Sequence, residues 1–182
     1  MSLIIGVPQS TEKELTLQCE KIFKRAKDIH LLKDEGCDPL KMVEETSEKR
    51  LNELLNKNIN VAEEKYLTDI ESIEKFYPII NTIRELFPDN QIINTGHFLY
   101  PKNGFMGWHT NSNEPYYRVY LTYTEEGNKS FFRYMDWDTK KIITSWDQKG
   151  LTIRKFKTYE ECPLWHCVGS ETNRLSLGYE LV

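Results

Sequence analysis

Two histidines in the second half of the chain are candidate metal ligands. His109 lies in the sequence GWHTN, and in an extended chain residues two apart point to the same side. His109 and Asn111 therefore project together. His166 lies in LWHCV and shares its face with two aliphatic residues. A neutral imidazole is a common ligand of iron, zinc and copper, but a lone histidine on a strand is more often structural. The pair needs support from other residues.

That support comes from a third segment, RLSLG, near the end of the chain. Arg174 and Ser176 lie two residues apart and share one face of an expected strand. A cation and a hydroxyl on the inner face of a barrel are costly to bury unless they bind something. A small carboxylate suits them, because arginine binds it through two parallel hydrogen bonds and serine adds a donor.

Taken together, these residues resemble the pattern of the Fe(II)- and 2-oxoglutarate-dependent oxygenases. That pattern is His-x-Asp, then a distal His some tens of residues later, an Arg about eight to ten residues after that His, and a Ser two residues after the Arg. The corresponding residues in this chain are His109, Asn111, His166, Arg174 and Ser176. The resemblance covers residues 91–182, half the chain. The stretch Trp108–Tyr123 followed by Ser130–Tyr134 is also similar to small oxygenases of bacteriophages and bacteria.

The resemblance implies a fold, a set of cofactors and a reaction. The fold is a double-stranded β-helix, a jelly-roll or cupin-like barrel. Fe(II) binds through His109, His166 and Asn111, and 2-oxoglutarate binds through Arg174 and Ser176. Tyr100 either hydrogen-bonds the far carboxylate of 2-oxoglutarate or packs in the core. O2 is the oxidant, and hydroxylation of a small molecule or of a residue in a protein is the expected outcome.

One position departs from the family pattern, because Asn111 stands where the family has a carboxylate. An amide oxygen can ligate iron but brings no negative charge, so Fe(II) should bind more weakly. Glu114 in the following loop, or Asp136 or Asp138 in a later turn, are alternative acids. Deamidation of Asn111 would also restore one.

Three functions remain open from the sequence. The first is an active oxygenase. The second is a catalytically weak or silent cupin-like module that binds a metal or a small acid, because Asn111 replaced the acid. The third is a metalloprotein that uses His97, His109 and His166 without 2-oxoglutarate; His97 by itself is better explained as a structural residue.

The elements that must position these residues change type near residue 90. Apolar residues at helical spacing predict a helix over Leu15–Ala26, capped by Ser10 or Thr11, and a second helix over Thr68–Leu86. Later segments are short, rich in β-branched or aromatic residues and separated by turn signals. The expected strands are Gln91–Tyr100, Tyr117–Thr124, Ser130–Tyr134, Lys141–Ser145, Leu151–Thr158, Leu164–Val168 and Arg174–Leu181. Helices followed by strands predict an α+β fold, with N-terminal helices packed on a C-terminal barrel.

Composition narrows the class of protein. The chain has 182 residues, which predicts a single domain, 1–182, with a helical segment over 1–90 and the double-stranded β-helix over 91–182. The 24 Lys and Arg against 28 Asp and Glu give a net charge of −4, so no nucleic-acid partner is expected. No apolar run could cross a membrane. Four cysteines without CxxC spacing fit a reducing compartment, and we expect a cytoplasmic protein of unspecified oligomeric state.

Overall fold

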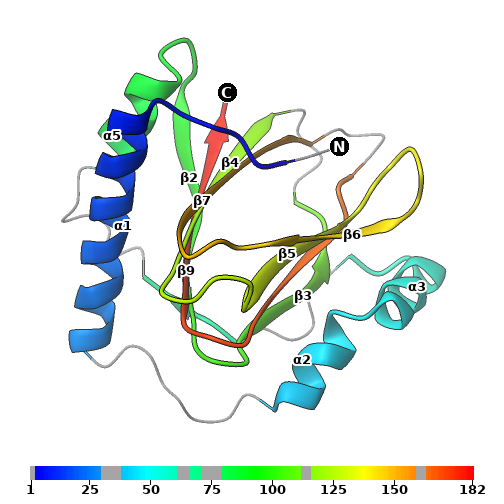
Figure 1. The fold of residues 1–182 in the computed structure, drawn as a ribbon. Coiled ribbons are helices and arrows are strands. Elements are labelled where there is room, and N and C mark those ends of the chain that lie inside the picture. Colours follow the sequence, from blue (N-terminus) through cyan, green and yellow to red (C-terminus); the bar gives the residue numbers. More distant parts are fainter. Residues whose placement is uncertain (1–2, 30–37, 61–65, 71–78, 112–115, 159–162) are drawn as a thin grey trace.

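Two antiparallel β-sheets face each other and form the body of the molecule (Figure 1). The structure is a computed structural model that describes residues 3–29, 38–60, 66–70, 79–111, 116–158 and 163–182. The architecture is the expected α+β arrangement, with helices and a double-stranded β-helix. The expected strands appear within two residues of their predicted ends, because turn residues separate them clearly along the sequence.

The larger sheet has five strands in the order β1-β2-β9-β4-β7. Its central strand β9 pairs with β2 on one side and β4 on the other, so Arg174 lies beside Tyr100 and Thr124. The strands are β1 (Thr68–Asp69), β2 (Ile92–Tyr100), β4 (Tyr117–Thr124), β7 (Gly150–Lys157) and β9 (Arg174–Leu181).

The smaller sheet has four strands in the order β3-β8-β5-β6. Its strands are β3 (Phe105–His109), β5 (Ser130–Met135), β6 (Ile142–Trp146) and β8 (His166–Ser170). Strand β8 places His166 beside His109 of β3 and Tyr134 of β5. The two histidine motifs therefore lie next to each other, although 57 positions separate them along the chain.

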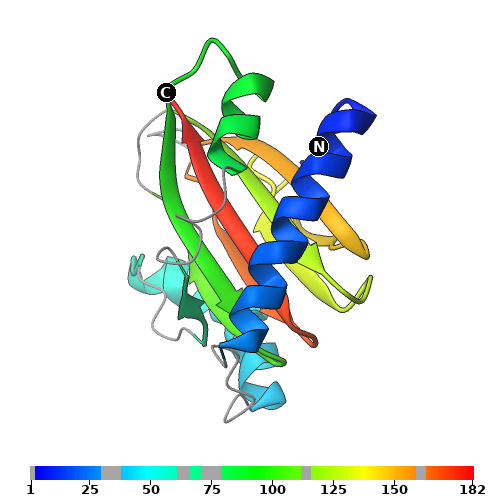
Figure 2. The same cartoon turned by 90° about the vertical axis from the view of Figure 1, so that its left-hand side faces the viewer.

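Two helices, α1 (Gln9–Asp28) and α5 (Ile79–Leu86), lie across the outer face of the larger sheet (Figure 2). The apolar buried residues of α1 are the ones that its helical spacing predicted, including Leu15, Ile22 and Phe23. They pack with outward-facing strand residues such as Leu175 and Leu177 in the largest apolar cluster. The outer face of the larger sheet is therefore part of the hydrophobic core, and a functional site would have to use its inner face.

The helices α2 (Pro39–Glu45) and α3 (Glu48–Lys57) lie beside the smaller sheet (Figure 1). Hydrogen bonds from the smaller sheet hold the link between them. The indole nitrogen of Trp108 donates to the carbonyl of Ser47 at 2.8 Å, and Arg133 donates to the carbonyl of Thr46 at 2.7 Å. Trp108 thus points away from the space between the sheets.

Two expectations about the first half were wrong. Helix α1 begins after Pro8, whose carbonyl accepts the first helical hydrogen bond from Glu12, so neither Ser10 nor Thr11 caps it. Within the described residues, the second expected helix is helical over α5, whereas Thr68–Asp69 pairs with β2 as a short strand. Residues 71–78 lie outside the described ranges. Among the described helices, none combines the length and the apolar character needed to cross a membrane.

Candidate active site

A cavity of about 200 Å³ lies between the two sheets and contains most of the residues that the sequence singled out. Its walls are the inward faces of β2, β4 and β9 from one sheet and of β3 and β8 from the other. It is lined by Thr95, Gly96, Phe98, Tyr100, Met106, His109, Asn111, Tyr120, His166, Val168, Ser176 and Gly178. Arg174 is absent from this lining.

An irregularity in β3 turns His109 toward the cavity. The register between β3 and β8 shifts between Met106 and His109, so one extra residue is inserted on this strand. Met106 and His109 both line the cavity although they are three residues apart. Strict alternation would have put Met106 and Trp108 on the same face; the bulge instead sends Trp108 outward into the cluster under α3.

The rings of His109 and His166 lie close together at one end of the cavity. Their centroids are 4.2 Å apart and their planes are inclined at 53°. In each ring Nδ1 faces a backbone carbonyl, that of Gly107 at 2.8 Å and that of Leu164 at 2.9 Å. Because a carbonyl can only accept, Nδ1 carries the proton in both rings and the lone pair of a neutral ring is on Nε2. The Nε2 atom of His166 is buried and has no hydrogen-bond partner among the described residues.

Aromatic side chains surround His166. Its ring stacks on Phe132 at 5.0 Å between centroids and lies 6.1 Å from Phe156. Burial lowers the pKa of His166 well below its ordinary value, and the neighbouring His109 lowers it further. His166 is therefore a neutral imidazole at physiological pH, which is the form that ligates a metal ion.

Asn111 reaches the same end of the cavity. Its amide nitrogen donates a hydrogen bond to the hydroxyl of Tyr120 at 3.1 Å.

Of the alternative acids, Glu114 lies outside the described residues, and Asp136 is engaged in its own turn, where its carboxylate accepts two hydrogen bonds from Thr139. Within the described ranges, no three His, Cys, Asp or Glu side chains gather to hold a metal ion. The donor set here is two imidazoles and one amide.

Arg174 lies deeper between the sheets and already has partners. Its Nε donates to Asp147 at 2.9 Å and one terminal nitrogen donates to Thr122 at 3.0 Å. The other terminal nitrogen is buried and has no partner among the described residues. The guanidinium lies 5.1 Å above the ring of Tyr100, whose hydroxyl has its pKa raised mainly by burial. Tyr100 and Ser176 thus separate Arg174 from the histidines.

Asp147 and Tyr120 are the site residues that the sequence did not reveal. Asp147 is fully buried and also accepts a hydrogen bond from Arg154 at 2.6 Å. Its arginine partners are 7 and 27 residues away, beyond the reach of any local pattern. Tyr120 had a usable signal, because Arg118, Tyr120 and Thr122 alternate with apolar residues along β4 and form a polar row on one face.

His97 and Arg118 lie at two further positions that bear on the site. His97 packs against Tyr179 at 5.1 Å on the outer face of the larger sheet, away from the cavity, so it cannot join His109 and His166 in one metal site. Arg118 pairs with Glu180 at 3.2 Å, and because the two side chains are only 6% and 13% exposed, the pair is largely buried.

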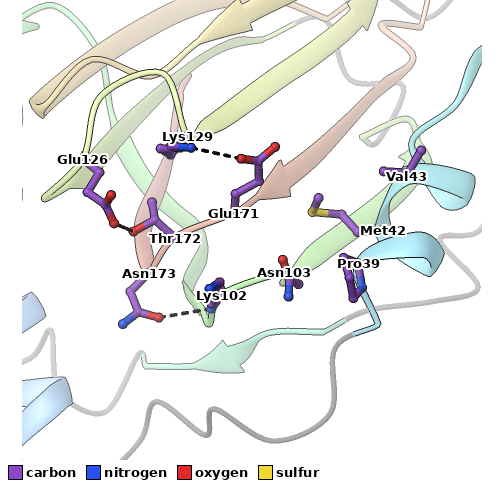
Figure 3. A pocket seen from close by; sticks show the side chains of 10 residues that line it. All are labelled: Pro39, Met42, Val43, Lys102, Asn103, Glu126, Lys129, Glu171, Thr172 and Asn173. Carbon is purple, nitrogen blue, oxygen red and sulfur yellow. Dashed lines mark hydrogen bonds and ion pairs between the residues drawn. The ribbon is translucent and has the colours of Figure 1, made fainter.

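A second, larger cavity of about 520 Å³ lies at the opposite end of the barrel, where turns connect β2 to β3 and β8 to β9 (Figure 3). Its polar side chains mostly satisfy one another. Lys129 pairs with Glu171 at 3.6 Å, and Thr172 donates to Glu126 at 2.7 Å. Its lining combines two lysines with two glutamates, so it has no charge preference for a ligand.

Comparisons with known proteins identify the fold. No family model matches the chain, and no curated protein matches it. Among solved structures, a prolyl hydroxylase from Trichoplax adhaerens, in complex with a hypoxia inducible factor oxygen degradation domain peptide fragment, has a TM-score of 0.51 at 12% identity. The match covers 100% of this chain and 81% of that one.

Two further matches are more distant in shape. A prolyl-4-hydroxylase from Pseudomonas putida has a TM-score of 0.49 at 16% identity, covering 98% of this chain and 89% of that one. A 2OG-Fe(II) oxygenase from Burkholderia pseudomallei has a TM-score of 0.41 at 15% identity, covering 64% and 65%. The Trichoplax match establishes that the chain has the double-stranded β-helix fold of the 2-oxoglutarate oxygenases.

Proposed function

We propose that this protein is an Fe(II)- and 2-oxoglutarate-dependent oxygenase that hydroxylates a small molecule or a residue of another protein. One observation carries the proposal. In an oxygenase-like fold, the imidazoles of His109 and His166 lie with their ring centroids 4.2 Å apart and have protonated Nδ1 atoms. The buried Nε2 of His166, which has no described partner, lies at the end of a cavity. A buried nitrogen lone pair is costly to leave unpaired, so it fits a ligand of a metal ion.

The donor set fits ferrous iron. His109 and His166 would bind through Nε2, because their Nδ1 atoms are committed to backbone carbonyls. The amide oxygen of Asn111 would be the third protein donor, and three donors leave coordination positions open. Iron held in this way would supply the activation of O2 that is coupled to oxidative decarboxylation of 2-oxoglutarate. Phe132 and Phe156 exclude water from the inner side of His166.

The far carboxylate of 2-oxoglutarate would bind at the deeper end of the cavity. Ser176 and Tyr100 line it there and offer hydroxyl groups. Arg174 lies behind them with one terminal nitrogen without a described partner, which can donate to an anion. Asp147 pairs with both Arg174 and Arg154, so the buried group as a whole carries one net positive charge. That residual charge supports binding of a carboxylate.

The substrate class has support from one relative. The Trichoplax prolyl hydroxylase was captured with a peptide, so a residue in a protein is a reasonable substrate for the same fold. A small molecule is the other option, and the net charge of −4 disfavours nucleic acid. We expect no membrane partner.

A second function, a silent metal- or acid-binding module, is favoured by two observations. Asn111 brings no charge to the metal, and the Nε of Arg174 is already paired with Asp147. Turnover of 2-oxoglutarate separates the two functions, and an absorption band checks beforehand that Fe(II) and 2-oxoglutarate bind. Anaerobic addition of Fe(II) and 2-oxoglutarate should produce a weak visible absorption band in either case. Turnover of 2-oxoglutarate to succinate under air should occur only if the protein is an oxygenase.

The cosubstrate assignment has its own test. Ser176→Ala removes a hydroxyl from the cavity and Arg174→Lys removes the planar fork while keeping the charge. Both should weaken 2-oxoglutarate binding by calorimetry far more than they weaken Fe(II) binding. Thr95→Ser, at the other end of the cavity lining, is the matched control and should leave 2-oxoglutarate affinity unchanged. Unchanged affinity in both Arg174→Lys and Ser176→Ala would remove the assignment.

A further inference from the structure

The hydrogen bond between Asn111 and Tyr120 can control how the amide is oriented toward a metal ion, which a carboxylate at position 111 would not require. A carboxylate offers two equivalent oxygens, so either can face a metal ion. An amide offers one oxygen, which accepts, and one NH2 group, which only donates. Rotation of the amide by half a turn would point two hydrogens at the cation. An asparagine ligand therefore needs something that fixes its orientation.

Tyr120 provides a fixed acceptor for the NH2 group. Its hydroxyl lies 3.1 Å from Nδ2 of Asn111. The ring is held edge-on against Phe156 at 5.0 Å and against Phe132 at 5.9 Å, so it has little freedom to move. With Nδ2 engaged in this bond, the oxygen of Asn111 is the amide atom left for a cation.

A buried ion pair also contacts the same hydroxyl. Arg118 also hydrogen-bonds the oxygen of Tyr120, and Glu180 holds Arg118 at 3.2 Å. All three residues lie on neighbouring strands, with Arg118 opposite Glu180 in the register of β4 and β9. A hydroxyl held by two partners is a stable reference point for the amide.

We infer that Tyr120 is a positioning residue that selects the amide oxygen of Asn111, instead of its NH2 group, as the atom presented to the metal ion. This inference rests on the proposed function, because it assumes that His109, His166 and Asn111 hold a divalent ion. Tyr120 itself acts through Asn111. If Tyr120 has this role, removal of its hydroxyl should weaken metal binding only while residue 111 is an amide.

A double-mutant cycle tests the inference with Co(II) as the probe and calorimetry as the readout. The four proteins are the wild type, Tyr120→Phe, Asn111→Asp and the double variant. Tyr120→Phe keeps the ring that packs on Phe132 and Phe156 and removes only the hydroxyl. In the wild-type background it should weaken Co(II) binding by about tenfold, as expected for loss of a partner that orients a metal ligand. In the Asn111→Asp background it should change affinity by less than about threefold, because either carboxylate oxygen can serve.

The outcomes are distinguishable. An equal loss in both backgrounds, or no loss in either, would overturn the inference while the metal site stands. If the folded wild type and Asn111→Asp both fail to bind Co(II), the proposed function fails, and the inference fails with it. The thermal midpoint of each protein controls for folding, and the visible spectrum of bound Co(II) reports a change of ligand independently of affinity.

Discussion

Single hydrogen bonds decide which atoms of the two histidines face the cavity. Each Nδ1 bonds to the carbonyl two residues earlier in the chain, Gly107 for His109 and Leu164 for His166. The same local geometry occurs on two neighbouring strands, so both rings are oriented before any ligand arrives. Preorganised rings bind a metal ion without an ordering cost, which is why these two residues are the strongest candidates for ligands.

Removal of either ring should abolish metal binding. We expect His109→Ala and His166→Ala each to eliminate stoichiometric Fe(II) binding, measured by anaerobic titration, while circular dichroism stays like that of the wild type. His97→Gln is the matched control, because His97 lies on the other face of the larger sheet. Near-normal iron affinity in either alanine variant would remove that residue from the site, and loss of binding in His97→Gln would revive the three-histidine alternative.

Restoring the acid at position 111 should strengthen the site. Asn111→Asp adds one negative charge beside the cation, and we expect Fe(II) to bind tighter by on the order of tenfold or more. If the protein is a weakened enzyme, succinate production should rise as well. Asn111→Ala, which removes the oxygen altogether, should bind Fe(II) more weakly than the wild type. An unchanged affinity in Asn111→Asp would mean that another residue completes the site, and Glu114 would be tested first.

The sequence could indicate which side chains gather at the site but not all of their partners. Alternation placed His109 with Asn111 and Arg174 with Ser176, because side-chain direction in a strand follows from position alone. The bonds from Asn111 to Tyr120 and from Asp147 to Arg174 join different strands. Their existence depends on sheet order and register, which one sequence does not specify.

At the scale of elements, an ion cluster joins the two sheets at the deeper end of the barrel. Asp147 follows β6 and is bonded by Ser130 of β5, both in the smaller sheet. Its two arginine partners, Arg154 of β7 and Arg174 of β9, belong to the larger sheet. All three charged side chains are fully buried. Asp147 therefore holds together strands that otherwise share no backbone ladder.

Loss of this charge should destabilise the whole fold. Asp147→Asn leaves two buried arginines without a counter-ion, and breaking such a group costs about 3–5 kcal/mol in the free energy of unfolding. Urea titration followed by fluorescence measures the change. Asp136→Asn is the control, because that aspartate lies partly exposed in the β5–β6 turn and should change stability much less. A loss below about 1 kcal/mol in Asp147→Asn would show that the cluster does not couple the sheets.

The same carboxylate predicts how stability depends on acid. Burial raises the pKa of Asp147, but the charges of Arg174 and Arg154 and the bond from Ser130 outweigh it, so the folded pKa is depressed. A depressed folded pKa means that its stabilisation is complete above the unfolded value of about 3.9 and is lost as pH falls below that value. Unfolding midpoints in urea should therefore drop steeply below about pH 4. Asp147→Asn should show a shallower drop over this window; an identical slope would contradict the linkage.

Strands were easier to predict than helices in this chain, for a physical reason. Most of the strands have Gly, Asn, Asp or Pro close to at least one end, and β4 and β9 begin and end at the expected residues. Thr68–Asp69 was expected to be helical, but pairing with β2 overrides a short stretch of helical spacing. The bulge in β3 was also unpredictable, because an inserted residue leaves no trace in the local composition.

At the scale of the molecule, we propose that residues 1–182 form one domain, in which the helical segment (residues 1–90) packs on the barrel (residues 91–182). Many contacts cross that boundary, several of them to the larger sheet. Strand β1 adds to the edge of β2, Ile4 bridges to Arg154 of β7, and α1 shares the largest apolar cluster with the outer faces of β4 and β9. Without the helices, the outer face of the larger sheet would expose that cluster to water, at about 25 cal/mol for each square ångström uncovered.

The shared cluster predicts a single unfolding transition, and the distribution of chromophores makes it measurable in the intact chain. All four tryptophans lie in residues 91–182, at positions 108, 137, 146 and 165, so their fluorescence reports the barrel. Long helices lie in residues 1–90, so ellipticity at the helical minimum reports mainly α1 and its neighbours. If α1 and the sheet bury one core, both signals should follow the same curve in urea and give the same midpoint.

A pair of substitutions in α1 makes this prediction specific to the shared core. Leu15→Ala, in the middle of the buried face of the helix, should shift both midpoints together by the same amount, since it removes about 2–5 kcal/mol of packing from the common cluster. Leu17→Ala, on the exposed side of the same helix, is the control and should shift neither by much. Two separate midpoints, or a Leu15→Ala shift confined to the ellipticity curve, would show that the helical segment is a domain of its own.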